Sequence, residues 1–137
     1  MIPPEGPRGQ RVLLARWSDK FREAGDGLVY GLRTQESLRV HLAFALAVVA
    51  VAAGLQVEAW RWAVLVLCIA MVVASELFNS AIEQLVRTLH PQRDPAIAAA
   101  LHLAAAGVLV NAIAAVAIGL IVLGPPLFHW ISAKLVA

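Results

Sequence analysis

The segment "WRWAVLVLCIAMVVASELFNSAIEQLVRTL", residues 60–89, decides how this chain folds. Its first half is almost entirely apolar, whereas its second half carries two glutamates, an asparagine and an arginine. A helix of this length is about 45 Å long, whereas the hydrocarbon core of a bilayer is only about 30 Å thick. The segment therefore predicts a membrane-spanning helix whose last turns project into the interface or the aqueous phase.

The composition of the whole chain indicates an integral membrane protein. Of its 137 residues 61% are hydrophobic and only 15% are charged, and the mean hydropathy is +0.77. These values lie far outside the range of water-soluble domains, and the length leaves room for one domain. The net charge of +2 comes from basic residues scattered along an apolar chain, which is typical of membrane flanks and does not indicate nucleic-acid binding.

The apolar stretches predict an all-α membrane protein with four helical segments. Residues 1–10, rich in proline and glycine, are expected to form a flexible tail, and residues 11–137 a single membrane domain. Residues 11–33 predict an amphipathic helix at the membrane surface, with a possible break at its glycines. Its apolar stripe consists of Trp17, Phe21, Ala24, Leu28 and Leu32. The expected spans are about 41–57, 60–89 and 96–123, the last of them closed by Gly124, Pro125 and Pro126.

The distribution of lysine and arginine predicts the orientation. Most basic residues lie before the first span or between the second and third spans, whereas the opposite side has only Arg61 and Lys134. Because cytoplasmic flanks carry the excess of positive charge, we expect a cytoplasmic N-terminus. Arg39 and His41, at the start of the first span, are typical of side chains that extend from a helix end to the interface.

Polar residues of the second span share one helical face. Glu76, Asn79, Ser80 and Glu83 are spaced at i, i+3, i+4 and i+7, and Arg87 continues the stripe. A charge within the bilayer costs about 2.5 kcal/mol or more, so this face needs a partner or a function. Either it joins helices through hydrogen bonds, or its carboxylates bind a divalent cation and act as a base on a lipid hydroxyl. The spacing leaves both interpretations open.

Three stretches resemble the small prokaryotic diacylglycerol kinase and undecaprenol kinase family. "ELFNSAIEQLV" (76–86) is similar to the signature of its second span, "KFREAGDGLVYGLRTQESLRVHL" (20–42) to its surface helix and first span, and "AAAGVLVNAIAAVAIGL" (104–120) to its third span. The resemblance implies a homotrimer in the bacterial inner membrane. It also implies an enzyme that transfers the γ-phosphate of ATP, with Mg²⁺, to a lipid alcohol at the cytoplasmic face. Diacylglycerol and undecaprenol are both possible substrates.

The resemblance assigns roles to individual residues. Glu76 matches the catalytic base, Asn79 its polar neighbour and Glu83 a metal-binding carboxylate. Ser80, Arg39 and His102 are expected near the lipid substrate. Leu101 and His102 occupy the positions of a lysine and an aspartate of the family. His102 could be a proton or metal partner of the site, or an imidazole that bonds Glu76 or Asn79.

Other departures from the family affect the nucleotide and metal sites. Gln35 stands where the family has its second metal-binding glutamate, and Glu36 follows it. Arg87 replaces an aspartate. We expect Glu36 to act as a metal ligand and Gln35 and Arg87 to act as nucleotide contacts. These departures leave an alternative function open, in which the chain is a catalytically inactive membrane scaffold with the kinase fold.

Overall fold

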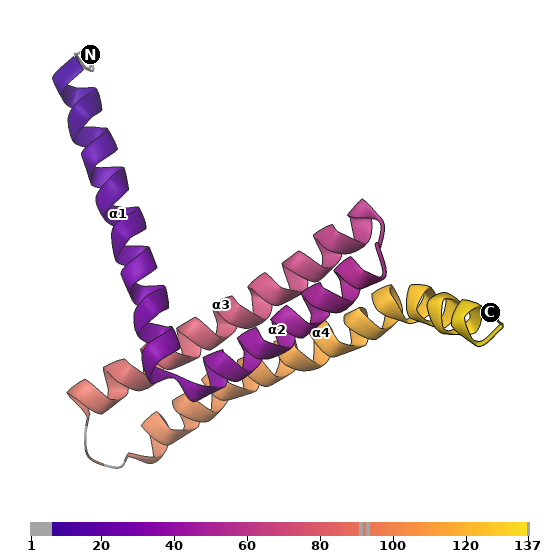
Figure 1. Ribbon diagram of the computed structural model, residues 1–137. Helices are drawn as coiled ribbons and strands as arrows, with labels where there is room; N and C mark the ends of the chain where they lie inside the picture. The colour runs from indigo at the N-terminus through magenta and orange to yellow at the C-terminus, as the bar shows by residue number, and fades with distance from the viewer. Residues whose placement is uncertain (1–6, 91, 93, 137) are drawn as a thin grey trace, which may run out of the picture. The chain divides into compact units, whose positions relative to one another are not determined.

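The computed structural model describes residues 7–90, 92 and 94–136, with side chains from residue 16 onward. Four α-helices account for almost all of these residues (Figure 1). They are α1 (Pro7–Thr34), α2 (Glu36–Gly54), α3 (Ala59–Leu89) and α4 (Pro95–Val136). The prediction of an all-α membrane protein, with an N-terminal amphipathic helix and three spans, is confirmed.

Helix α1 lies in a unit of its own, Met1–Thr34. It begins at Pro7, so residues 7–10 of the expected tail belong to the helix, while residues 1–6 lie outside the described part of the chain. The helix continues through Gly25 and Gly27 without the expected break, because a glycine inside a helix costs only about 1 kcal/mol. Trp17 and Phe21 of the apolar stripe are exposed, with ring centroids 6.3 Å apart.

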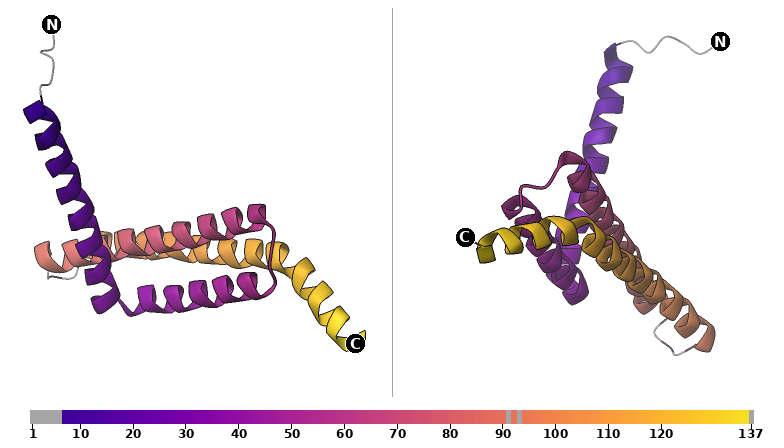
Figure 2. Two further views of the ribbon diagram at one scale, coloured as in Figure 1. Left: turned by 45° about the horizontal axis from the view of Figure 1, so that its top comes forward. Right: turned by 90° about the vertical axis from the view of Figure 1, so that its right-hand side faces the viewer.

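The second unit, Gln35–Ala137, contains the helices α2, α3 and α4, and all three are long and apolar enough to cross a membrane. They run side by side, and α3 packs against both neighbours (Figure 2). A small core joins them where Ala52, Leu65 and Val122 are buried together. Most other large apolar side chains of these helices are exposed, as expected for surfaces that face lipid or other protein copies.

The turn between α2 and α3 is closed by main-chain hydrogen bonds. The N–H of Gln56 donates to the carbonyl of Ala53 (3.1 Å), and the N–H of Val57 donates to that of Ala52 (3.2 Å). This pair of bonds is a Schellman motif, in which the residue after the helix adopts a left-handed conformation. Gln56 does so with φ 51°, although glycine is the residue that favours this region.

Helix α4 continues past the point where the third span was expected to end. Pro125 and Pro126 lie inside the helix, which runs on to Val136 and bends away from α2 and α3 in its last turns (Figures 1 and 2). A proline removes the hydrogen bond to the carbonyl four residues earlier, which for Pro126 is that of Val122. The guanidinium of Arg61 in α3 donates a hydrogen bond to this oxygen instead.

Arg61 is itself held in place at the start of α3. Its Nε lies 3.1 Å from Oε2 of Glu58, which also accepts a hydrogen bond from Nε1 of Trp60 at 2.8 Å. The guanidinium stacks over the Trp60 ring, 4.5 Å from its centroid. The hydrogen bonds from Arg61 and, second, from Trp60 hold the pKa of the Glu58 carboxyl below its usual range.

Candidate active site

Helix α3 carries three buried polar residues on one face: Glu76, Asn79 and Ser80. Their spacing of three and four residues places them one above another along the helix. In a membrane helix a buried carboxylate needs hydrogen-bond partners or a positive neighbour, since bilayer and protein interior alike offer little solvation. The face that carries these residues is therefore the candidate functional site of the chain.

The carboxylate of Glu76 is held by helix α2. The hydroxyl of Ser37 donates a hydrogen bond to Oε1, and Nε2 of His41 lies 3.9 Å from Oε2. Ser37 and His41 are four residues apart in α2, so both side chains point to the same side of that helix. The side chain of Glu76 is only 3% exposed, whereas that of His41 is 25% exposed. One oxygen of the carboxylate is thus fixed by a donor and the other faces a partly open imidazole.

A second polar group lies further along α3. Nδ2 of Asn79 donates to Oε1 of Glu83 at 3.0 Å, and Arg87 donates to Oε2 of Glu83 at 3.4 Å. Each of these residues is one helical turn from the next, and the Glu83 side chain is 33% exposed. The other amide atom of Asn79, Oδ1, is buried without a hydrogen-bond partner among the described residues. This buried oxygen is therefore an acceptor that the described residues leave unsatisfied.

The oxygen atoms of Glu83 and Asn79 are of the type that divalent cations prefer. Mg²⁺ prefers oxygen ligands and is commonly bound by one or two carboxylates together with substrate phosphates and water. Among the described residues, groups of three or more histidine, cysteine, aspartate or glutamate side chains that could hold a metal alone are absent. Glu83 and the Asn79 amide oxygen by themselves therefore offer too few ligands to hold such an ion.

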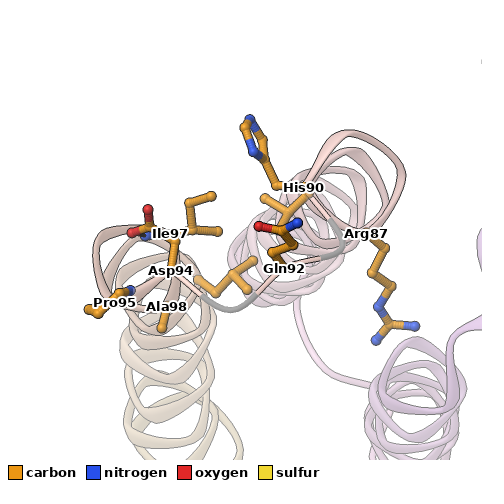
Figure 3. A pocket seen from close by; sticks show the side chains of 9 residues that line it. Arg87, His90, Gln92, Asp94, Pro95, Ile97 and Ala98 are labelled. Atoms are coloured by element: carbon orange, nitrogen blue, oxygen red, sulfur yellow. Dashed lines mark hydrogen bonds between the residues drawn. The ribbon is translucent and has the colours of Figure 1, made fainter.

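A hollow of about 690 Å³ lies where α3 ends and α4 begins (Figure 3). Arg87 of α3 and His90, directly after α3, line it on one side, and Ile97 and Leu101 of α4 line it on the other. In the close-up, Arg87 and His90 project in different directions from the end of α3. The hollow thus brings Arg87 of α3 and Leu101 of α4 to the same surface.

Other expected site residues stand apart from these two groups. Arg39 is exposed on α2, and His102 is exposed on α4. The polar contacts of Glu76 come from Ser37 and His41 of α2. A bond from His102 to Glu76, one of the alternatives left open for this histidine, is not among the contacts of the described residues. The sequence interpretation of His41 as an interface residue missed this contact, although its spacing from Ser37 was a usable signal.

The chain bends out of helical geometry at Gln35, directly before the exposed Glu36. Gln35 has an extended backbone (φ −106°, ψ 114°), and α2 begins at Glu36. A helix that ran through both residues would separate their side chains by about 100°. Because the helix is interrupted at Gln35, the directions of the two side chains are not tied to this helical separation. Glu36 is the acidic residue of the first turn of α2.

Fold and site together define a small helical membrane protein with a buried carboxylate and a second, more open one on the same helix. The model of the prokaryotic diacylglycerol kinase family matches residues 22–123, and the chain belongs to this family. A relative from Synechocystis sp. that bears the name diacylglycerol kinase is 40% identical over 108 residues. The match covers 78% of this chain and 62% of the relative. All residues of the two polar groups lie within the family match.

Proposed function

We propose that this protein is an ATP-dependent lipid kinase that phosphorylates a membrane lipid alcohol, diacylglycerol or undecaprenol. The observation that carries the proposal is the buried Glu76, fixed by Ser37 of a neighbouring helix and one turn from Asn79, in a chain of this family. A carboxylate shielded from water and aimed by a fixed hydroxyl donor is suited to accept a proton from an alcohol.

In the proposed reaction Glu76 removes the proton of the lipid hydroxyl. The oxygen then forms a bond to the γ-phosphorus of ATP, while the bond between this phosphorus and the β–γ bridging oxygen breaks and ADP leaves. Such transfers depend mainly on positioning and on neutralising the charge of the phosphates. Asn79 contributes positioning, because its amide fixes one oxygen of Glu83.

Glu83 is the proposed magnesium ligand, with the free amide oxygen of Asn79 beside it. When bound, the ion would neutralise phosphate oxygens and hold them in line with the attacking alcohol. Glu36 is proposed as a further metal ligand, and Gln35 and Arg87 as nucleotide contacts. Ser80, Arg39 and His102 are proposed contacts of the lipid.

We further propose that the protein is a homotrimer of the bacterial inner membrane with its N-terminus in the cytoplasm. The excess of lysine and arginine before α2, together with Arg87 and Arg93 near the turn between α3 and α4, supports this orientation. The extensive exposed apolar faces of α2 and α4 support association with copies of the same chain or with lipid. Both carboxylates would then act at the cytoplasmic edge of the membrane, where ATP is available.

The catalytically inactive scaffold is the second candidate. The observation in its favour is the ion pair between Arg87 and Glu83, which engages the carboxylate proposed for the metal. Because Arg87 is 73% exposed, solvent weakens this pair, and phosphates could draw the guanidinium away from Glu83. The scaffold predicts intact folding with no phosphoryl transfer.

Phosphoryl transfer from labelled ATP tests the proposal. The purified protein in lipid vesicles receives Mg²⁺ and either diacylglycerol or undecaprenol, and the wild type is compared with Glu76→Gln and Glu83→Gln. Glu58→Gln, a glutamate substitution between α2 and α3, is the matched control and should retain activity. Transfer that both site variants abolish supports the kinase. A folded wild type that phosphorylates neither lipid overturns it and favours the scaffold.

A further inference from the structure

The contact between His41 and Glu76 bears on a step that the proposed reaction leaves open. If Glu76 accepts the alcohol proton, it must lose that proton before the next turnover. Its side chain is only 3% exposed, so direct release to water is hindered. A neighbouring group that can take up a proton and that reaches solvent would remove this obstacle.

His41 carries an imidazole that can accept a proton, and it lies near the start of α2, where this span is expected to meet the membrane interface. Its Nε2 lies 3.9 Å from Oε2 of Glu76, and its side chain is 25% exposed. A small shift or one bridging water connects atoms at this distance. The other carboxylate oxygen, Oε1, already accepts the hydrogen bond of Ser37, so Oε2 is the oxygen that is free to receive and pass on a proton.

The other charged groups near this part of the bundle are engaged or exposed elsewhere. On α3, Glu83 is bonded by Asn79 and Arg87. On α2 itself, Glu36 and Arg39 are exposed. On α4, His102 is exposed. Among the described residues that contact the Glu76 carboxylate, Ser37 and His41, only His41 carries a side chain that can accept a proton.

We propose that His41 is the positioning residue that fixes Oε2 of Glu76 and receives from it the proton of the lipid hydroxyl. This inference rests on the proposed kinase function. After phosphoryl transfer, the proton bonded to Oε2 moves to Nε2 of His41, which restores the Glu76 carboxylate and leaves an imidazolium ion. The imidazolium then releases the proton to water. Ser37 keeps the carboxylate in one orientation during this exchange.

The test compares two substitutions of His41 in the full-length protein in lipid vesicles. His41→Gln keeps a polar group of similar reach but cannot carry a proton, and His41→Ala leaves space for added imidazole. We expect kcat to fall by roughly 10-fold or more in both variants, with the KM values for ATP and lipid little changed. Free imidazole should restore kcat in His41→Ala but not in His41→Gln. His129→Ala, an exposed histidine near the end of α4, is the control and should behave as the wild type.

Each outcome has a distinct meaning. Full activity of His41→Gln would show that a polar contact suffices, and this overturns the proton role while the kinase function stands. Loss of activity in both variants without rescue by imidazole, at unchanged thermal stability, also overturns it. A folded wild type that transfers no phosphate overturns the kinase function and this inference together. Restoration of His41→Ala by imidazole supports the inference and shows in the same experiment that the variant is folded.

Discussion

Arg61 of α3 donates a hydrogen bond to the main-chain oxygen of Val122 in α4, four residues before Pro126. This is the oxygen that the proline leaves without its helical partner. A side chain of one helix thus replaces a main-chain bond that is missing from another. The replacement satisfies the carbonyl that Pro126 frees, at the point where α4 continues through two consecutive prolines with a bend.

Removal of this side chain should destabilise the protein only while the proline is present. We expect Arg61→Met to lower the free energy of unfolding by about 1 to 2 kcal/mol, because a buried carbonyl loses a charged donor. In a Pro126→Ala background the alanine N–H can bond the Val122 carbonyl again. Arg61→Met should then cost less stability, because only the contacts of Arg61 with Glu58 and Trp60 are lost. Unfolding in mixed micelles measures both differences as a double-mutant cycle. Equal losses in the two backgrounds would contradict the compensation.

Asn79 should matter more for activity than for stability. Asn79→Leu removes the donor to Glu83 and also the buried, unpaired Oδ1. Because an unsatisfied buried oxygen is itself unfavourable, we expect thermal stability to stay the same or to rise. The Mg²⁺ concentration for half-maximal activity should increase, and kcat should fall by about 10-fold or more.

Ser75→Ala is the matched control for this substitution. Ser75 lies on the same helix, but its hydroxyl bonds the carbonyl of Val72 within α3. Its removal should leave the magnesium dependence unchanged. An Asn79→Leu variant with normal magnesium dependence would show that Asn79 does not take part in magnesium binding.

A lysine at position 101 should strengthen nucleotide binding. Leu101 lines the hollow between the ends of α3 and α4, together with Arg87. A second cation there would attract phosphates, so Leu101→Lys is expected to lower the KM for ATP several-fold. Leu103→Lys adds the same charge about 200° further around the helix and serves as the control. Equal KM values in both variants and the wild type would place the nucleotide away from the hollow.

The turn between α2 and α3 offers a stabilising substitution. Gln56 adopts φ 51°, a conformation that is unfavourable for a residue with a side chain. We expect Gln56→Gly to raise the free energy of unfolding by about 0.5 to 1 kcal/mol. Leu55→Gly, at a residue with ordinary helical geometry (φ −81°), should lower it instead. Thermal unfolding of both variants decides between a turn that prefers glycine and one that merely tolerates it.

Hydropathy predicts the number of helices but not where they end. The first span was expected to begin at His41, whereas α2 begins at Glu36. Charged residues such as Glu36 and Arg39 lower the hydropathy of the first turn, yet their main chain continues the same helical bonds. Near the C-terminus of the chain, Pro125 and Pro126 predict the end of the third span, whereas α4 continues to Val136. Arg61, which donates to the carbonyl that Pro126 frees, lies in another helix and is not visible in the local pattern.

Sequence spacing likewise predicts the polar face of α3 but not the helix that packs against it. The spacing of Glu76, Asn79 and Ser80 fixes their common face, since it depends only on the helical repeat. Which helix covers this face depends on packing, and depth in the membrane does not reveal it. A bond from His102 to Glu76 was one of the alternatives, whereas the histidine that contacts Glu76 is His41 of α2. The roles of these residues in catalysis stay predictions until the variants are measured.

The link between Ser37 and Glu76 has a consequence for biosynthesis. A lone α3 would carry a carboxylate into the lipid at a cost of about 2.5 kcal/mol or more during insertion. The residues that accommodate this carboxylate lie on α2, which is synthesised first and is joined to α3 by only the four residues 55–58. The two segments should therefore leave the translocon together as a hairpin, in which Ser37 of α2 can already bond the carboxylate of Glu76.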